Sequence, residues 1–173
     1  MFVNWLLLLT LLLHCQTAPP PAGSQFWPYT GYATARLYTF NETYPLPNET
    51  QMPQTSVVVN GDINPAATYV SEIAPDDMLQ IVQIMTQTSD MVAMGLSKCF
   101  IPRHGIVLYD DQNNIQAQLS MCFECDQIVA SPPVRYKKIF SKQKVWKEKD
   151  IAKAEKDIAA IAQVVSRYAP LRW

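Results

Sequence analysis

The sequence has little glycine, little charge and only two histidines. Its 173 residues include five glycines against 13 prolines, which favours ordered loops over flexible linkers. Charged residues make up 17% and apolar residues 49%, a balance that argues against a disordered chain and is typical of a globular one. The net charge of −1 provides no global attraction for nucleic acid, so no nucleic-acid partner is expected.

Basic residues are nearly absent from the first hundred positions, where only Arg36 and Lys98 stand against seven acidic residues. The rest of the chain holds twelve basic and eight acidic residues, and seven of the twelve fall within residues 135–149. Such a segment can attract anionic lipid or an acidic protein. One hypothesis is therefore a partner-binding module that uses residues 135–149, and the simpler interpretation is a solvated linker and helix start.

The sequence also lacks an apolar run of the roughly 20 residues that a membrane-spanning helix needs. The apolar block at residues 5–13 (WLLLLTLLL) instead has the length of the apolar region of an export signal. Cys15 follows this block closely, which resembles the lipid-attachment cysteine of bacterial lipoprotein signals. The sequence therefore predicts an exported protein of the cell envelope, held at the membrane by a lipid on Cys15. Ordinary signal cleavage after Ala18 is the alternative.

Three regions follow from these features. Residues 1–15 are expected to be the export or lipoprotein signal, and residues 16–30, rich in proline, a tether. Residues 31–173 are long enough for one domain with a core and too short for two.

Alternation and turn signals predict an α+β fold for this domain. Strands are expected at residues 35–40, 56–59, 68–70, 105–109 and 115–123. Asn60-Gly61 is a strong hairpin signal, and the polar residues 110–114 join the last two strands. In the final strand, Ile115 and every second residue after it are expected to face the core, with Cys122 on the opposite face.

Apolar residues at helical spacing predict two helices. The first begins at Pro75, followed by Asp76 and Asp77 at the positive end of the helix dipole. The second is longer and covers approximately residues 141–168. We therefore predict a small antiparallel sheet with one mid-chain helix and a long C-terminal helix packed on it.

Three cysteines and one histidine remain beyond the signal, with the spacing Cys99-x4-His104-x17-Cys122-x2-Cys125. Three thiols and one imidazole are ligands that zinc prefers in closed, four-coordinate sites. If the hairpin turn is centred near Gln112, His104 lies opposite Ser120, and Cys122 is a diagonal neighbour on the same sheet face. A register shift of one residue would move Cys122 to the other face.

A disulfide is the competing interpretation, since an exported protein meets an oxidising compartment. Cys99 could pair with Cys122 or Cys125, or the last two could form a redox-active pair. Their position at a strand end, away from any helix N-terminus, argues against redox catalysis. The preferred function is a non-enzymatic envelope protein with a structural Cys/His cluster, holding zinc or a disulfide. The alternative is a thiol- or metal-dependent envelope enzyme that uses Cys99, His104, Cys122 and Cys125.

The segment KCFIPRHGIVLYD at residues 98–110, followed by CFEC at residues 122–125, resembles an uncharacterised bacterial family. Its members, many of them exported or lipid-anchored, are marked by a C-F-x-P-R-H-G-I-V segment and a following C-F-E-C. The resemblance covers about residues 76–126, and Asn113-Asn114 stand where the family usually has glycine. It implies that the three cysteines and His104 belong together, and it brings no activity.

Overall fold

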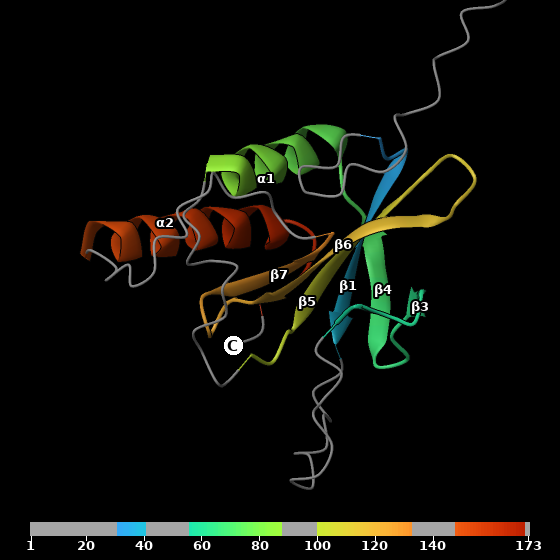
Figure 1. The fold of residues 1–173 in the computed structure, drawn as a ribbon, viewed down its shortest axis with the longest axis horizontal. Helices are drawn as coiled ribbons and strands as arrows, with labels where there is room; N and C mark the ends of the chain where they lie inside the picture. The colour runs from blue at the N-terminus through green and yellow to red at the C-terminus, as the bar shows by residue number, and fades with distance from the viewer. Residues whose placement is uncertain (1–30, 41–55, 88–99, 133–147, 172–173) are drawn as a thin grey trace, which may run out of the picture.

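A computed structural model of the chain describes residues 31–40, 56–87, 100–132 and 148–171. They form an α+β fold, in which a five-stranded antiparallel sheet carries two helices (Figure 1). The strands of this sheet are β1 (Thr34–Phe40), β4 (Ala67–Glu72), β5 (His104–Tyr109), β6 (Ile115–Cys122) and β7 (Gln127–Ser131). The helices are α1 (Pro75–Gln87) and α2 (Glu148–Val165), and a separate short hairpin consists of β2 (Val58–Val59) and β3 (Asp62–Ile63).

The strands lie in the order β4-β1-β5-β6-β7, so β5 is central, and all six of its residues are buried. Asp110 shapes the turn from β5 to β6, since its Oδ1 accepts hydrogen bonds from the backbone N–H groups of Asn114 and Gln112. These donors stabilise the carboxylate and lower the pKa of Asp110. Asn113 adopts a left-handed conformation with φ 65°, which asparagine tolerates better than most residues.

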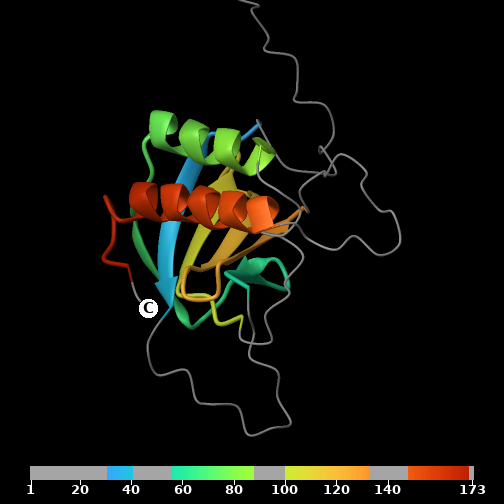
Figure 2. The same cartoon turned by 90° about the vertical axis from the view of Figure 1, so that its left-hand side faces the viewer.

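The two helices lie side by side on one face of the sheet (Figures 1 and 2). Their sheet-facing residues recur at three- and four-residue intervals, as the sequence predicted. The buried helix residues are Met78, Ile81, Val82, Met85, Ala154, Ile158, Ile161, Ala162, Val164 and Val165. The strands contribute Ala35, Leu37, Ile106, Leu108, Ala117, Leu119, Met121 and Ile128 to the same cluster. Each large side chain buried here contributes ~1.5–3 kcal/mol, so this layer is the main core.

A polar network joins the end of α2 to the start of α1. The Tyr168 hydroxyl donates to Oδ2 of Asp77 at 2.5 Å and accepts from the backbone N–H of Ala74 at 2.9 Å. Arg167 pairs with Oδ1 of the same carboxylate at 2.9 Å. Asp77 also lies in the first turn of α1, where the helix dipole favours a negative charge. The network therefore holds the chain after α2 against the beginning of α1.

The opposite face of the sheet carries a second, smaller core. Its buried members are Tyr38, Phe40, Val57, Val107 and Tyr109. The segment that contains β2 and β3 packs on these residues through Val58, Ile63 and Ala66. Asn60 and Gly61 have φ values of 53° and 91°, as the tight hairpin turn predicted for this dipeptide requires.

Side chains of β6 hold this segment on the sheet. The backbone N–H of Val57 donates to Oγ of Ser120 at 2.9 Å, and that of Val58 donates to Oε1 of Gln118 at 2.7 Å. Ser56 adds a 2.8 Å hydrogen bond from its hydroxyl to the same Gln118 oxygen. Residues 56–58 therefore lie across the face of the sheet instead of joining its edge as a sixth strand.

Gly105 on β5 makes this close approach possible. A Cβ atom at this position would lie 2.5 Å from Cβ of Val57, far inside the sum of the atomic radii. The neighbour is itself a Cβ atom fixed to the backbone, so no side-chain rotation can relieve the overlap.

The fold confirms most of the predicted elements and corrects three details. Residues 68–70 belong to β4, which pairs with β1 and does not return along residues 56–59. β7 was not predicted. Ile115 packs in the second core and does not face the helices, because a bulge separates it from Ala117. The long C-terminal helix is described from Glu148, and residues 141–147 lie outside the described residues.

We expect Gly105→Ala to lower the free energy of unfolding by ~1–3 kcal/mol, the usual cost of overpacking a close contact. Urea unfolding followed by circular dichroism measures the change. In a Val57→Gly background the partner Cβ is absent, so the same substitution should then cost much less. Equal costs in the two backgrounds would contradict the proposed contact.

Candidate functional site

The register between β5 and β6 decides where the predicted Cys/His residues lie. Near the turn, Tyr109 pairs with Ile115, in agreement with a turn centred at Gln112. The next pair is Leu108 with Ala117, so Gln116 is an extra residue on β6. Every later pair is shifted by one residue relative to the prediction.

His104 consequently pairs with Met121, and the prediction that it lies opposite Ser120 is wrong. Met121 belongs to the core beneath the helices, so His104 faces the helices as well. Cys122 follows Met121 on the strand and faces the opposite side of the sheet. His104 and Cys122 therefore lie on opposite faces of the sheet, and the prediction that they share one face is wrong.

His104 is fully buried and contacts the segment that follows α2. Its Nε2 lies 3.2 Å from the carbonyl oxygen of Pro170, and its ring centroid lies 5.3 Å from that of Phe123. A carbonyl oxygen can only accept, so Nε2 carries the hydrogen of this contact. The imidazole thus links the C-terminal end of the described domain to the central strand.

Cys122 is 1% exposed and pairs on the sheet with Gln127 of β7. Cys125 is half-buried in the four-residue turn that joins β6 to β7, and the two sulfurs are not joined to each other. Among the residues that the structure describes, no three His, Cys, Asp or Glu side chains are grouped to hold a metal. Cys15 and Cys99 lie outside these residues, so the lipid anchor and the four-ligand zinc site stay predictions.

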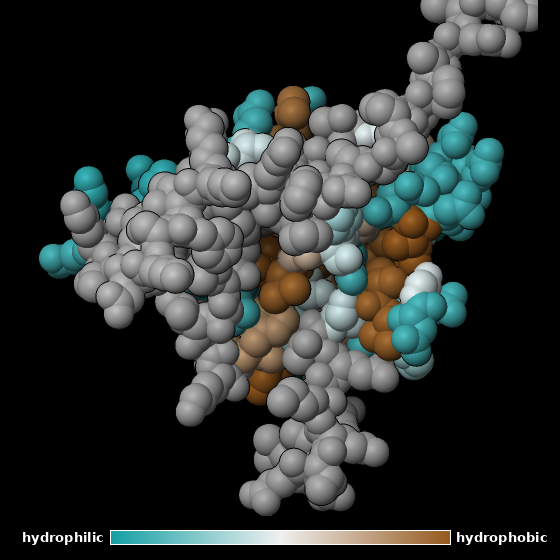
Figure 3. Space-filling model, in the orientation of Figure 1, coloured by the Kyte–Doolittle hydropathy of each residue, from teal (hydrophilic) through white to brown (hydrophobic). Residues whose placement is uncertain are grey.

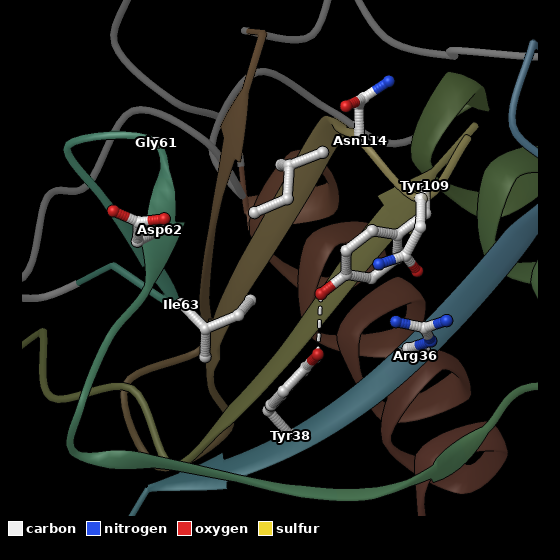
Figure 4. Close-up of a pocket in the computed structure, with 9 residues that line it drawn as sticks. Arg36, Tyr38, Gly61, Asp62, Ile63, Tyr109 and Asn114 are labelled. Atoms are coloured by element: carbon white, nitrogen blue, oxygen red, sulfur yellow. Dashed lines mark hydrogen bonds between the residues drawn. The ribbon is translucent and has the colours of Figure 1, made fainter. Parts of the chain in front are cut away.

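The second face of the sheet contains a pocket of about 620 Å³ that is open to solvent. It lies between the β2–β3 turn and the β5–β6 turn, and Arg36, Tyr38 and Tyr109 reach into it from β1 and β5 (Figure 4). The other lining residues are Gly61, Asp62, Ile63, Asn113, Asn114 and Ile115. This volume is in the range of small-molecule sites.

Two tyrosine hydroxyls meet at the pocket wall. The Oη atoms of Tyr38 and Tyr109 are 2.6 Å apart, and the rings of both residues are buried. Burial raises the pKa of Tyr38 well above its usual value, and the hydrogen bond with Tyr109 adds to the shift. The phenol therefore stays neutral at physiological pH. The hydrogen bond between the hydroxyls uses one of their two hydrogens, which leaves the other to donate to a ligand.

Arg36 provides the positive charge of the pocket. Its guanidinium carbon lies 4.3 Å from the centroid of the Tyr109 ring, a cation–π arrangement. Its Nε is 3.7 Å from Oε1 of Glu72, longer than a hydrogen bond, and the Glu72 side chain is 57% exposed. This ion pair is weak, so Arg36 retains donors for a ligand.

This pocket was not predicted from the sequence. Arg36 and Tyr38 alternate on one strand, which places them on one face, and that signal was present. Tyr109 joins them through the pairing of β5 with β1. Ile115 joins them only through the bulge, and Asp62 only through the folding of residues 56–66 across the sheet. Neither event leaves a local sequence signal.

In comparisons with known proteins, no family model, curated protein or solved structure matches the chain. The family resemblance of residues 98–110 and 122–125 therefore stays a prediction. In the described part of the chain, no helix is long and apolar enough to cross a membrane.

The raised pKa of Tyr38 predicts a loss of stability in alkaline solution. The folded state holds the phenol proton more tightly than the unfolded chain, whose tyrosine releases it near its usual value of 10.0. The free energy of unfolding should therefore fall as the pH rises above that value, and less steeply in Tyr38→Phe. Urea titrations from neutral pH to about pH 12 measure both slopes.

Tyr69→Phe is the matched control, because this ring is 52% exposed and packs edge-on against Tyr38. It should keep the wild-type slope. Identical slopes in wild type and Tyr38→Phe would show that Tyr38 does not titrate as we expect.

Proposed function

We propose that this chain is an exported, membrane-tethered domain of the cell envelope that binds a small ligand without transforming it. The observation that carries the binding function is the pocket with Arg36, Tyr38 and Tyr109 on its wall. A fixed cation and a neutral hydroxyl donor converge there, beside the apolar side chains of Ile63 and Ile115. Such a mixture of apolar wall and few oriented polar groups is typical of ligand sites.

A structural role for the Cys/His residues is part of this proposal. His104 and Cys122 are both buried, and the imidazole already contacts a backbone carbonyl. A general base must reach a substrate proton at hydrogen-bond distance, which a fully buried ring does not favour. We assign these side chains to packing around β5 and β6, and zinc or a disulfide that involves Cys99 would reinforce the same region.

Two further hypotheses gain no supporting observation. The thiol- or metal-dependent enzyme would use Cys99, Cys122 and Cys125 with His104, and the partner-binding module would use the basic segment 135–149. Cys99 and residues 135–147 lie outside the described residues, and Lys149, at the start of α2, is exposed.

The tether rests on Cys15 and is tested by metabolic labelling with a radioactive fatty acid in a bacterial host. Wild type should incorporate the label and sediment with the membrane fraction, because the lipid is attached at this thiol. Cys15→Ser should lose both properties, whereas Cys125→Ser should keep the label. An unlabelled wild-type chain would refute the lipid anchor.

The binding function is tested by filling the pocket. Ile63→Trp adds a large side chain to the lining, so it should abolish binding without removing any polar group. Ligand-observed NMR with a panel of amino acids, carboxylic acids, amines and sugars measures this. At least one member should bind wild type and lose binding to the variant.

Leu79→Trp is the matched control, because Leu79 is exposed on α1, which covers the other face of the sheet. It should bind as wild type does. Circular dichroism establishes that both variants fold. A panel with no binder, or a binder that Ile63→Trp retains, would overturn the proposed function.

A further inference from the structure

The pocket carries two charged side chains, and they lie on opposite sides of it. Arg36 extends from β1 on one side, and Asp62 belongs to β3 on the other (Figure 4). The remaining lining residues are neutral, and the tyrosine hydroxyls and Ile63 lie between the two charges. The site therefore has a positive end and a negative end.

The positive end is suited to a carboxylate. The guanidinium of Arg36 lies over the Tyr109 ring, and the N–H groups of a guanidinium can donate in pairs to the two oxygens of a carboxylate. The tyrosine pair adds one O–H donor beside it. The Arg36 side chain is 27% exposed, so these donors are accessible and partly shielded from water.

The negative end is suited to an ammonium group. Asp62 is exposed, and within the described residues no cationic side chain lies at ion-pair distance from its carboxylate. A cationic group of a ligand would supply the missing partner, and a second carboxylate there would be repelled.

Apolar surface separates the two ends. Ile63 comes from β3 and Ile115 from β6, and both pack on the second core. Figure 3 shows hydrophilic atoms over the β5–β6 turn and the β2–β3 turn, with hydrophobic side chains between them. A ligand that spans the ends would place an apolar side chain or body against these residues.

We propose that the ligand of this pocket is a small zwitterion whose carboxylate and ammonium group are separated by an apolar chain, as in an ω-amino acid. Its carboxylate binds Arg36 and the tyrosine pair, and its ammonium group faces Asp62. This inference rests on the proposed binding function and adds its chemical class. A dicarboxylate would meet Asp62 and a diamine would meet Arg36, so the charge pattern rejects both.

The test compares three probes that differ in one charge each. 6-Aminohexanoate carries both groups at the two ends of an apolar chain, 6-aminohexanamide lacks the carboxylate, and hexanoate lacks the ammonium group. Isothermal titration calorimetry with the full chain should give a Kd for 6-aminohexanoate at least about tenfold lower than for either analogue, because each analogue leaves one end unpaired.

Two variants test which charged residue binds which group of the ligand. Arg36→Gln should remove the preference for 6-aminohexanoate over 6-aminohexanamide, and Asp62→Asn should remove the preference for 6-aminohexanoate over hexanoate. Arg103→Gln and Asp111→Asn change the same charges at residues that do not line the pocket, so both should keep wild-type preferences.

The outcomes separate this inference from the function it rests on. Equal affinity for 6-aminohexanoate and an analogue, a preference over hexanoate that survives in Asp62→Asn, or no binding of 6-aminohexanoate would each overturn the zwitterion. If another member of the NMR panel binds wild type and does not bind Ile63→Trp, the proposed binding function stands without the zwitterion. If no member of the panel loses binding in Ile63→Trp, both proposals fail.

Discussion

The contact between Gly105 and Val57 is the constraint on which the second face of the sheet depends. Only a residue without Cβ lets the backbone of residues 56–58 approach the central strand this closely. That approach brings the Val57 and Val58 amides within reach of Ser120 and Gln118. It also positions the β2–β3 turn beside Tyr109, so the pocket exists because one position of β5 lacks a side chain.

The pocket also shows how polar groups can lie in a core without a large desolvation cost. The hydroxyls of Tyr38 and Tyr109 are hydrogen-bonded to each other, and the guanidinium of Arg36 lies over the face of the Tyr109 ring. The rings thus contribute apolar area to the second core, and their polar ends remain at its boundary. The same residues therefore stabilise the fold and form the binding surface.

The sequence predicted the elements better than the relations between them. Helical spacing, the Asn60-Gly61 turn and the β5–β6 hairpin are local patterns, and each was found where the pattern placed it. The register beyond Ala117 was wrong because the bulge at Gln116 depends on the hydrogen bonds of a particular turn, which strand alternation does not encode. The pocket is lined by three segments that are distant in sequence, and no local sequence pattern predicts that they lie together.

The bulge makes β6 tolerant of a change in length at one point only. Removal of the extra residue at position 116 would leave the pairs on both sides of it in place, Tyr109 with Ile115 and Leu108 with Ala117. Loss of a residue farther along would instead move Met121 out of the core beneath the helices to the opposite face of the sheet, and Cys122 from that face into the core. Among related chains, insertions and deletions in this strand should therefore gather beside the turn, and its distal half should keep a constant length.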